Sequence, residues 1–230
     1  MEDLLALGAS LMQRAEEETS LRRDWRAALY RDGLTILLLI FRPLRRANLV
    51  SLRLGESLTE QPDGYWIRLP AEAMKNGRPY EARLPELLCD PLERYLTVWR
   101  PVLLRGRQDT TFLVGARGRP FTSEALYGRL TQHTEQAFGR PISPHLFRDI
   151  AVTALGEEDP ELVHLGRLLL HHADGRTTEA HYNHAREHHA MRRYHGLLQK
   201  YRQQVGATAP LNRSTGPGPD FAGMSDQDSA

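Results

Sequence analysis

Apolar residues recur at helical spacing through the first part of the chain. Leu4 and Leu11 lie two helical turns apart within residues 3–18, and further apolar residues fall between them, which predicts an amphipathic helix. Residues 22–40 predict a second helix that becomes nearly all apolar toward its end, so this end should be buried. Proline has no backbone N–H group, and Pro43 should therefore end this helix.

The pattern then changes from helical to alternating. Residues 47–54 predict a short helix, and residues 61–64, Gln-Pro-Asp-Gly, give a turn signal. Residues 65–69 and 80–84 are typical of an outgoing and a returning strand. Between these strands, residues 75–77 predict a tight turn, because Asn-Gly is suited to a positive φ. A small antiparallel sheet is therefore expected inside a helical protein.

Helices resume after the sheet. They are predicted at residues 85–104, 123–138, 144–155, 160–170 and 186–201. Thr122 has the side chain expected of a helix cap for the second of them. Residues 207–230 are rich in Gly, Pro, Ser, Thr and Asp, and we expect them to be disordered. The fold class predicted by the whole pattern is mainly α with a small antiparallel β-sheet (α+β).

Composition indicates the class of protein and the compartment in which it acts. Of the 230 residues, 40% are hydrophobic and 26% are charged, which is ordinary for a globular protein. The longest mostly apolar run, residues 34–41, is far shorter than the about 20 residues that span a bilayer. The start of the chain lacks the pattern of a secretory signal, and Cys89 is the only cysteine, which excludes an intrachain disulfide. These features favour a cytoplasmic protein without a membrane partner.

The charged residues are unevenly distributed. Lysine occurs only at positions 75 and 200, so nearly all positive charge is arginine, which binds phosphate in a planar, bidentate way. A GC-rich genome that favours arginine codons explains the same bias. Nine of the ten histidines lie between His145 and His195, which directs the search for chemistry to that half.

Two segments in that half carry candidate functional side chains. His145 and Arg148 lie three positions apart on a predicted helix and therefore share a face, although a surface pair has the same spacing. His172 follows an apolar helix, and Tyr182 comes ten residues later, after a Thr-Thr helix start. A tyrosine in such a place is more often a packing residue with its hydroxyl at the surface.

Two candidates lie earlier. Arg45 begins the short helix that follows the buried one, so rigid structure holds its backbone, and a solvated charge is the alternative. Lys75 lies on the turn of the sheet, where an exposed lysine is common.

The order and setting of these residues resemble the catalytic domain of the tyrosine recombinases, also called the phage integrase family. The family pattern is an arginine, a lysine on a hairpin, His-x-x-Arg, a histidine or tryptophan, and a tyrosine. It corresponds to Arg45, Lys75, His145 with Arg148, His172 and Tyr182. The resemblance extends over about residues 27–201.

The sequence departs from the family pattern at several places. Asn48 stands where the family usually has an acidic residue, and the usual Leu-Gly-His triplet is Leu-His-His here. The active-site histidine is therefore His171 or His172, and the spacing to Tyr182 favours His172. About twenty residues precede the second helix, where the family usually has a DNA-clamping, core-binding domain.

The resulting domain expectation has three parts. Residues 1–20 form an N-terminal helix or linker without the core-binding domain, residues 21–206 form the catalytic domain, and residues 207–230 form the disordered tail.

The resemblance implies site-specific DNA recombination, such as integration or excision of a mobile element. Tyr182 would form a covalent 3′-phosphotyrosine link, while Arg45 and Arg148 would bind the non-bridging phosphate oxygens. Lys75 would protonate the leaving 5′-oxygen. The resemblance further implies that His145 assists proton transfer and that His172 binds the scissile phosphate.

The implied partners are double-stranded DNA and further copies of the chain. Residues 186–201 would join a homo-tetramer on DNA by docking on a neighbouring protomer, or would pack within their own chain. No metal or other cofactor is expected.

Two other classes of function remain open. The protein could be a catalytically impaired or truncated relative that binds DNA, which Asn48, His171 and the missing core-binding domain favour. It could also bind a metal through histidines at helical spacing, although no cysteine or carboxylate completes a recognisable set. These histidines are His181, His184, His188 and His189.

Overall fold

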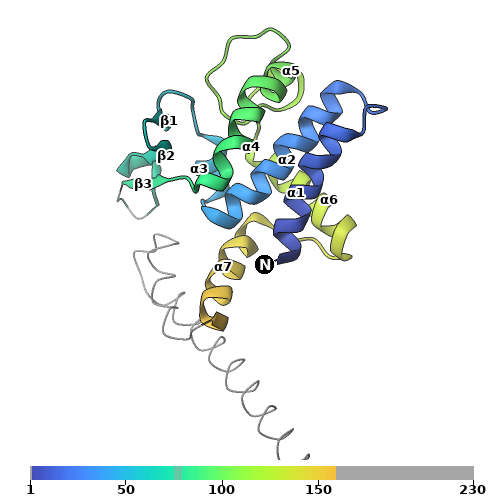
Figure 1. Cartoon of the computed structure of the whole chain (residues 1–230). Helices are drawn as coiled ribbons and strands as arrows, with labels where there is room; N and C mark the ends of the chain where they lie inside the picture. The colour runs from blue at the N-terminus through green and yellow to red at the C-terminus, as the bar shows by residue number, and fades with distance from the viewer. Residues whose placement is uncertain (1, 76, 78, 159–230) are drawn as a thin grey trace, which may run out of the picture. The chain divides into compact units, whose positions relative to one another are not determined.

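The computed structural model describes residues 2–75, 77 and 79–158, which all belong to one compact unit. Its helices are α1 (Glu2–Glu17), α2 (Arg23–Phe41), α3 (Arg46–Val50), α4 (Cys89–Arg94), α5 (Arg100–Leu104), α6 (Ser123–Phe138) and α7 (Pro144–Glu158). Its strands are β1 (Leu58–Gln61), β2 (Gly64–Leu69) and β3 (Tyr80–Arg83). The predicted fold class is confirmed, and Figure 1 shows the sheet at one edge of the helical body. None of the described helices has the length and hydropathy needed to cross a bilayer.

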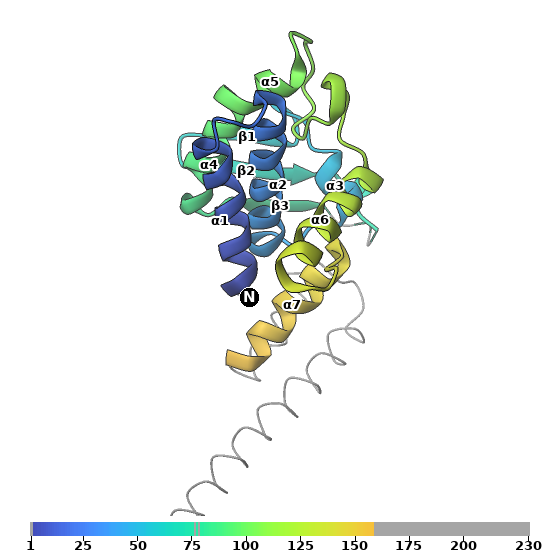
Figure 2. The same cartoon turned by 90° about the vertical axis from the view of Figure 1, so that its right-hand side faces the viewer.

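Helices α1 and α2 lie side by side and confirm the first two predicted helices (Figure 1 and Figure 2). Gly8 and Gly33 lie where the two helices cross. A Cβ atom at Gly33 would lie 2.5 Å from the Gly8 carbonyl oxygen and 2.8 Å from Met12 Cγ. Only hydrogen atoms fit at this crossing, and the two backbones therefore approach closely.

Helix α3 is shorter than predicted and ends at Val50 instead of residue 54. The chain beyond it pairs with a distant segment: the Phe112 N–H donates to the Leu52 carbonyl at 2.9 Å, and the Leu54 N–H donates to the Thr110 carbonyl at 2.8 Å. These backbone bonds replace the helical ones, and local sequence does not reveal a partner so far along the chain.

The sheet has three antiparallel strands in the order β1-β2-β3, and the sequence pattern missed β1. The predicted turn at residues 61–64 joins β1 to β2, with Gln61 paired to Gly64. The predicted turn at residues 75–77 lies in a longer connection over residues 70–79, which includes a 3-10 turn. Gly77 has φ +63°, as expected for the glycine of Asn-Gly.

The predicted helix over residues 85–104 is divided into several segments. A 3-10 turn precedes α4, and a π-helical segment, η3 (Tyr95–Trp99), separates α4 from α5. Pro101 has no N–H group for the carbonyl one turn earlier, and the wider turn lies directly before it. The proline therefore accounts for the interruption.

Helix α6 has the predicted bounds. The Thr122 Oγ1 atom accepts a hydrogen bond from the Ala125 N–H at 3.1 Å, and Gly139 ends the helix with φ +70°. Helix α7 begins at Pro144 as predicted and extends beyond residue 155. The predicted helices at residues 160–170 and 186–201 and the tail at residues 207–230 lie outside the described residues.

A buried cluster of charges joins α6 to α2. The Asp32 carboxylate accepts hydrogen bonds from Arg31 Nη2 at 2.6 Å and from Arg129 Nε at 2.7 Å, and it lies 3.0 Å from His133 Nε2. Burial alone would raise the pKa of Asp32, but Arg31, His133 and Arg129 together hold it below its ordinary value. The carboxylate is therefore charged and fixes the position of α6 against α2.

Candidate active site

Arg148 lies on α7, and its side chain is buried, with 5% of its surface exposed. Its Nη1 atom donates a hydrogen bond to the carbonyl of Pro43, in the segment between α2 and α3. Phe147 and Val152 on the same helix are also buried and help to seat α7 against the core. The fold therefore places a guanidinium from late in the chain against the beginning of α3.

Arg45 lies at the N-terminal cap of α3 with an extended backbone, and it is half-buried. Burial, and after it the positive charge of Arg45, lower the pKa of Arg148 to about 10, although Asp149 and Tyr80 act in the opposite direction. The Arg148 guanidinium therefore remains charged at neutral pH. The structure thus brings together two cations that repel each other, which is the arrangement expected of a site for an anion.

Tyr80, at the start of β3, lies on another side of this site. Its hydroxyl is buried, and burial raises its pKa to about 12, although the charges of Arg42 and Arg148 act in the opposite direction. The phenol is therefore neutral at physiological pH. Sequence reasoning missed Tyr80, although its place in an alternating strand predicts an inward side chain.

His145 lies one turn before Arg148, but its side chain is 77% exposed. Its Nε2 atom lies 3.9 Å from Asp149 Oδ2. The two residues of the His-x-x-Arg motif thus differ in their surroundings, because α7 is packed on one side only. The arginine is buried beside Arg45, whereas the imidazole is open to solvent.

Lys75 is exposed in the connection between β2 and β3. The preceding residue, Met74, is buried, and its Sδ atom lies 3.0 Å from the Asn48 Nδ2 atom of α3. Asn48 is also buried. The short helix that begins at Arg45 therefore contacts the base of the loop that carries Lys75.

The remaining predicted site residues lie outside the described residues. They are His172, the alternative His171, and Tyr182. The four histidines of the metal-site alternative lie there as well. Within the described residues, no group of three or more His, Cys, Asp or Glu side chains is arranged to hold a metal ion.

Comparisons with known proteins find recombinases among the similar proteins. No protein-family model matches the chain. The tyrosine recombinase XerD of Pseudomonas aeruginosa is 35% identical over 89 residues, which are 38% of this chain and 30% of that protein. Over this segment the chain is similar to a tyrosine recombinase.

Solved structures of recombinases have the same fold. XerA recombinase matches with a TM-score of 0.59 and 18% identity, over 84% of this chain and 62% of that chain. XerH site-specific recombinase matches with a TM-score of 0.57 and 19% identity, over 80% of this chain and 48% of that chain. That structure is a post-cleavage complex of XerH bound to palindromic difH substrate. The chain thus spans less than two thirds of the length of each of these recombinases.

Proposed function

We propose that this chain performs site-specific DNA recombination, in which it cuts and rejoins strands through a covalent 3′-phosphotyrosine at Tyr182. The observation that carries this proposal is the buried guanidinium of Arg148 beside that of Arg45. Burying Arg148 beside a second cation is unfavourable, and an anion bound against the two would offset part of this cost. A DNA phosphodiester supplies such an anion.

The two arginines would act most strongly in the transition state. Negative charge grows on the non-bridging oxygens when the phosphorus becomes pentacoordinate, and preorganised donors bind this charge better than that of the ground state. Each such donor contributes on the order of 10² to 10³ in rate. The Pro43 carbonyl fixes the Arg148 guanidinium in advance, so little reorganisation accompanies the reaction.

The bond changes in the proposed reaction are balanced without an external reactant. The Tyr182 phenol oxygen attacks the scissile phosphorus, and the bond from phosphorus to the 5′-oxygen breaks. His145 accepts the phenol proton, while the ammonium of Lys75 gives a proton to the leaving 5′-oxygen. The 3′-phosphotyrosine retains the ester, and a 5′-hydroxyl reverses the step to rejoin a strand.

The surroundings of Lys75 and His145 support their proposed roles. Both side chains are exposed, and a substrate can therefore reach them. The contact between Asn48 and Met74 connects the Lys75 loop to the helix that Arg45 begins. His172 is proposed to hydrogen-bond the scissile phosphate.

Double-stranded DNA is the proposed substrate, and copies of the chain are the proposed partners. The related XerH is described as bound to a palindromic substrate, and a palindrome offers two equivalent half-sites. We extend this arrangement to a homo-tetramer on DNA, joined through residues 186–201. Deletion of residues 190–230 should abolish assembly on DNA, and unchanged assembly in native gels would contradict it.

The catalytic proposal can be tested by trapping the covalent intermediate. The purified chain is mixed with end-labelled duplexes of random sequence that carry scattered nicks, so that a short cleaved fragment is released and rejoining stops. An adduct that resists detergent is expected from the native chain and from the matched control Tyr127→Phe, an exposed tyrosine on α6, but not from Tyr182→Phe. An adduct that persists in Tyr182→Phe would overturn the assignment.

The same experiment separates the alternative function. Asn48 in place of an acidic residue favours a relative that binds DNA without cutting it. Retention of the labelled duplexes in a mobility-shift gel, with no adduct from any nicked substrate, would identify such a DNA-binding protein.

A further inference from the structure

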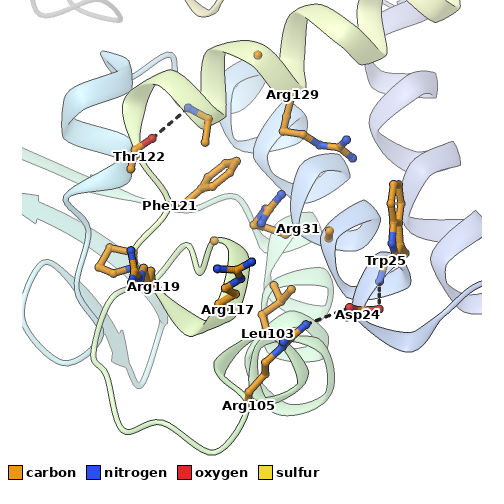
Figure 3. A pocket seen from close by; sticks show the side chains of 15 residues that line it. Asp24, Trp25, Arg31, Leu103, Arg105, Arg117, Arg119, Phe121, Thr122 and Arg129 are labelled. Carbon is orange, nitrogen blue, oxygen red and sulfur yellow. Dashed lines mark hydrogen bonds and ion pairs between the residues drawn. The ribbon is translucent and has the colours of Figure 1, made fainter.

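A second concave site lies among α2, α5, the loop before α6 and α6 itself (Figure 3). It has a volume of about 700 Å³, which lies in the range of about 300–1,000 Å³ found for ligand pockets. None of its lining residues is Arg45, Lys75, His145 or Arg148. The site is therefore separate from the candidate catalytic residues that the structure describes.

The floor and one wall of this pocket are apolar. Leu103 and Phe121 are buried, and the Arg31 guanidinium lies 3.9 Å above the centre of the Phe121 ring. Trp25 projects from α2 on the other side, as Figure 3 shows, and 58% of its surface is exposed. An indole exposed to this extent beside an apolar hollow is typical of a contact surface.

The lining of the pocket is more basic than acidic, although Arg31 and Arg129 are paired with the buried Asp32. Arginines at positions 31, 105, 117, 119 and 129 line it, whereas Asp24 is the one acidic lining residue. Asp24 is already paired, because its Oδ2 atom lies 3.1 Å from Arg105 Nη2 and 3.0 Å from Arg22 Nη2. Within the described part of the chain, the side chains of Arg117 and Arg119 have no ion pair or hydrogen bond.

The loop that carries these two arginines is held firmly. Arg117 has φ +58°, in the left-handed region that residues other than glycine rarely adopt. A Cβ atom at Gly118 would lie 2.6 Å from the Leu104 carbonyl oxygen, so the loop lies directly against α5. The Gly115 N–H donates to the Arg119 carbonyl at 2.7 Å, which closes the loop. The two guanidinium groups are therefore presented on a fixed backbone.

We propose that this pocket binds an acidic peptide segment of a partner protein that inserts one large apolar side chain. That side chain would lie among Trp25, Leu103 and Phe121, and flanking carboxylates would face Arg117 and Arg119. Charge complementarity and the apolar floor together select this occupant. The DNA backbone would satisfy the arginines but has no apolar side chain to fill the floor.

The test measures fluorescence anisotropy of a labelled synthetic peptide of aspartates around one central phenylalanine. The full chain should bind this peptide, and a peptide with serine in place of the phenylalanine should bind about tenfold more weakly. The double variant Arg117→Gln/Arg119→Gln and the single variant Trp25→Ala should each weaken binding by about tenfold. Arg140→Gln, an exposed arginine outside the pocket, is the matched control and should leave binding unchanged.

Thermal melting of each variant shows whether it is folded, and Arg119→Gln alone serves as a second variant if the double one is not. Three results would overturn the proposal. The native chain fails to bind the peptide, or the pocket variants bind as well as Arg140→Gln. Alternatively, an unlabelled DNA duplex displaces the peptide and the same variants weaken DNA binding equally, which would make the pocket a nucleic-acid site.

Discussion

At the scale of single residues, the chemistry depends on how a few cations are held. Arg148 is buried, next to a like charge, and fixed by one carbonyl group that belongs to a different part of the chain. Asp32 is the opposite case, a buried anion surrounded by two guanidinium groups and an imidazole. Arg148 thus lies beside a like charge, whereas Asp32 is surrounded by opposite charges that fix it in the structure.

Arg148→Lys tests whether phosphate binding needs the guanidinium group itself or only a positive charge at this position. An ammonium group cannot both donate to the Pro43 carbonyl and present a planar fork to phosphate. We therefore expect strand cleavage to fall by on the order of 10² while the chain stays folded. Adduct formation on nicked duplexes gives the rate, with Arg140→Lys as the control. Equal rates of adduct formation in the two variants would show that Arg148 is not part of the active site.

Asp32→Asn should strongly destabilise the fold at neutral pH. The substitution leaves Arg31 and Arg129 without their shared anion, and loss of one partner of a buried ion pair costs about 3–5 kcal/mol. Urea denaturation measures the free energy of unfolding. Asp24→Asn, whose carboxyl is partly exposed, should cost less than about 1 kcal/mol.

The same carboxyl predicts a pH dependence. Because the pKa of Asp32 is lowered in the folded state, its stabilising effect is complete above its ordinary value of 3.8 and is lost as the pH falls through the lower folded value. The difference in unfolding free energy between native chain and Asp32→Asn should therefore narrow below about pH 4. A difference that stays constant from pH 7 to pH 2 would show that Asp32 is not the group responsible.

At the scale of secondary structure elements, close packing of α1 on α2 provides the base for the site. The Gly8–Gly33 crossing brings these helices together, and the end of α2 leads directly to Pro43 and α3. A displacement of α2 would therefore be transmitted to the carbonyl that holds Arg148. Helix α6 is held separately, through Asp32.

Gly33→Ala should destabilise the fold by about 1–3 kcal/mol, because the added methyl group would overlap the Gly8 carbonyl, which cannot move as a flexible side chain does. Gly128→Ala on α6 is the matched control. A Cβ atom there would meet nothing within 4 Å, and the better helix propensity of alanine should stabilise the fold by up to about 1 kcal/mol. Similar melting temperatures for both variants would contradict the close crossing.

At the scale of the whole molecule, the sequence predicted what depends on local pattern. The cap at Thr122 could be predicted from its side chain, and the buried end of α2 from its apolar residues, which recur every three or four positions in a buried helix. The pairing of Pro43 with Arg148 was not, since nothing near either residue specifies its partner. Likewise, strand β1 depends on β2 for its hydrogen bonds, and the arginine-lined pocket is assembled from four segments.

In the candidate site, too, local features could be predicted from the sequence, whereas contacts between distant segments could not. Motif order predicted Arg45 and Arg148 as site residues, and the fold brings the two together, with His145 on the same helix one turn before Arg148. Spacing alone gave no sign that the histidine would be exposed and the arginine buried. The position of Tyr80 beside Arg148 was also not predicted, because it depends on which face of the sheet meets α7.

The decisive measurement uses a DNA site recovered from the trapped adducts, with the scissile phosphate replaced by an uncharged methylphosphonate. If Arg148 neutralises the charge of that phosphate, Arg148→Ala should form the Tyr182 adduct markedly faster on the methylphosphonate than on the natural phosphodiester. If Arg148→Ala is equally slow on both substrates while its circular dichroism matches that of the native chain, the proposed binding of the scissile phosphate by Arg148 is wrong.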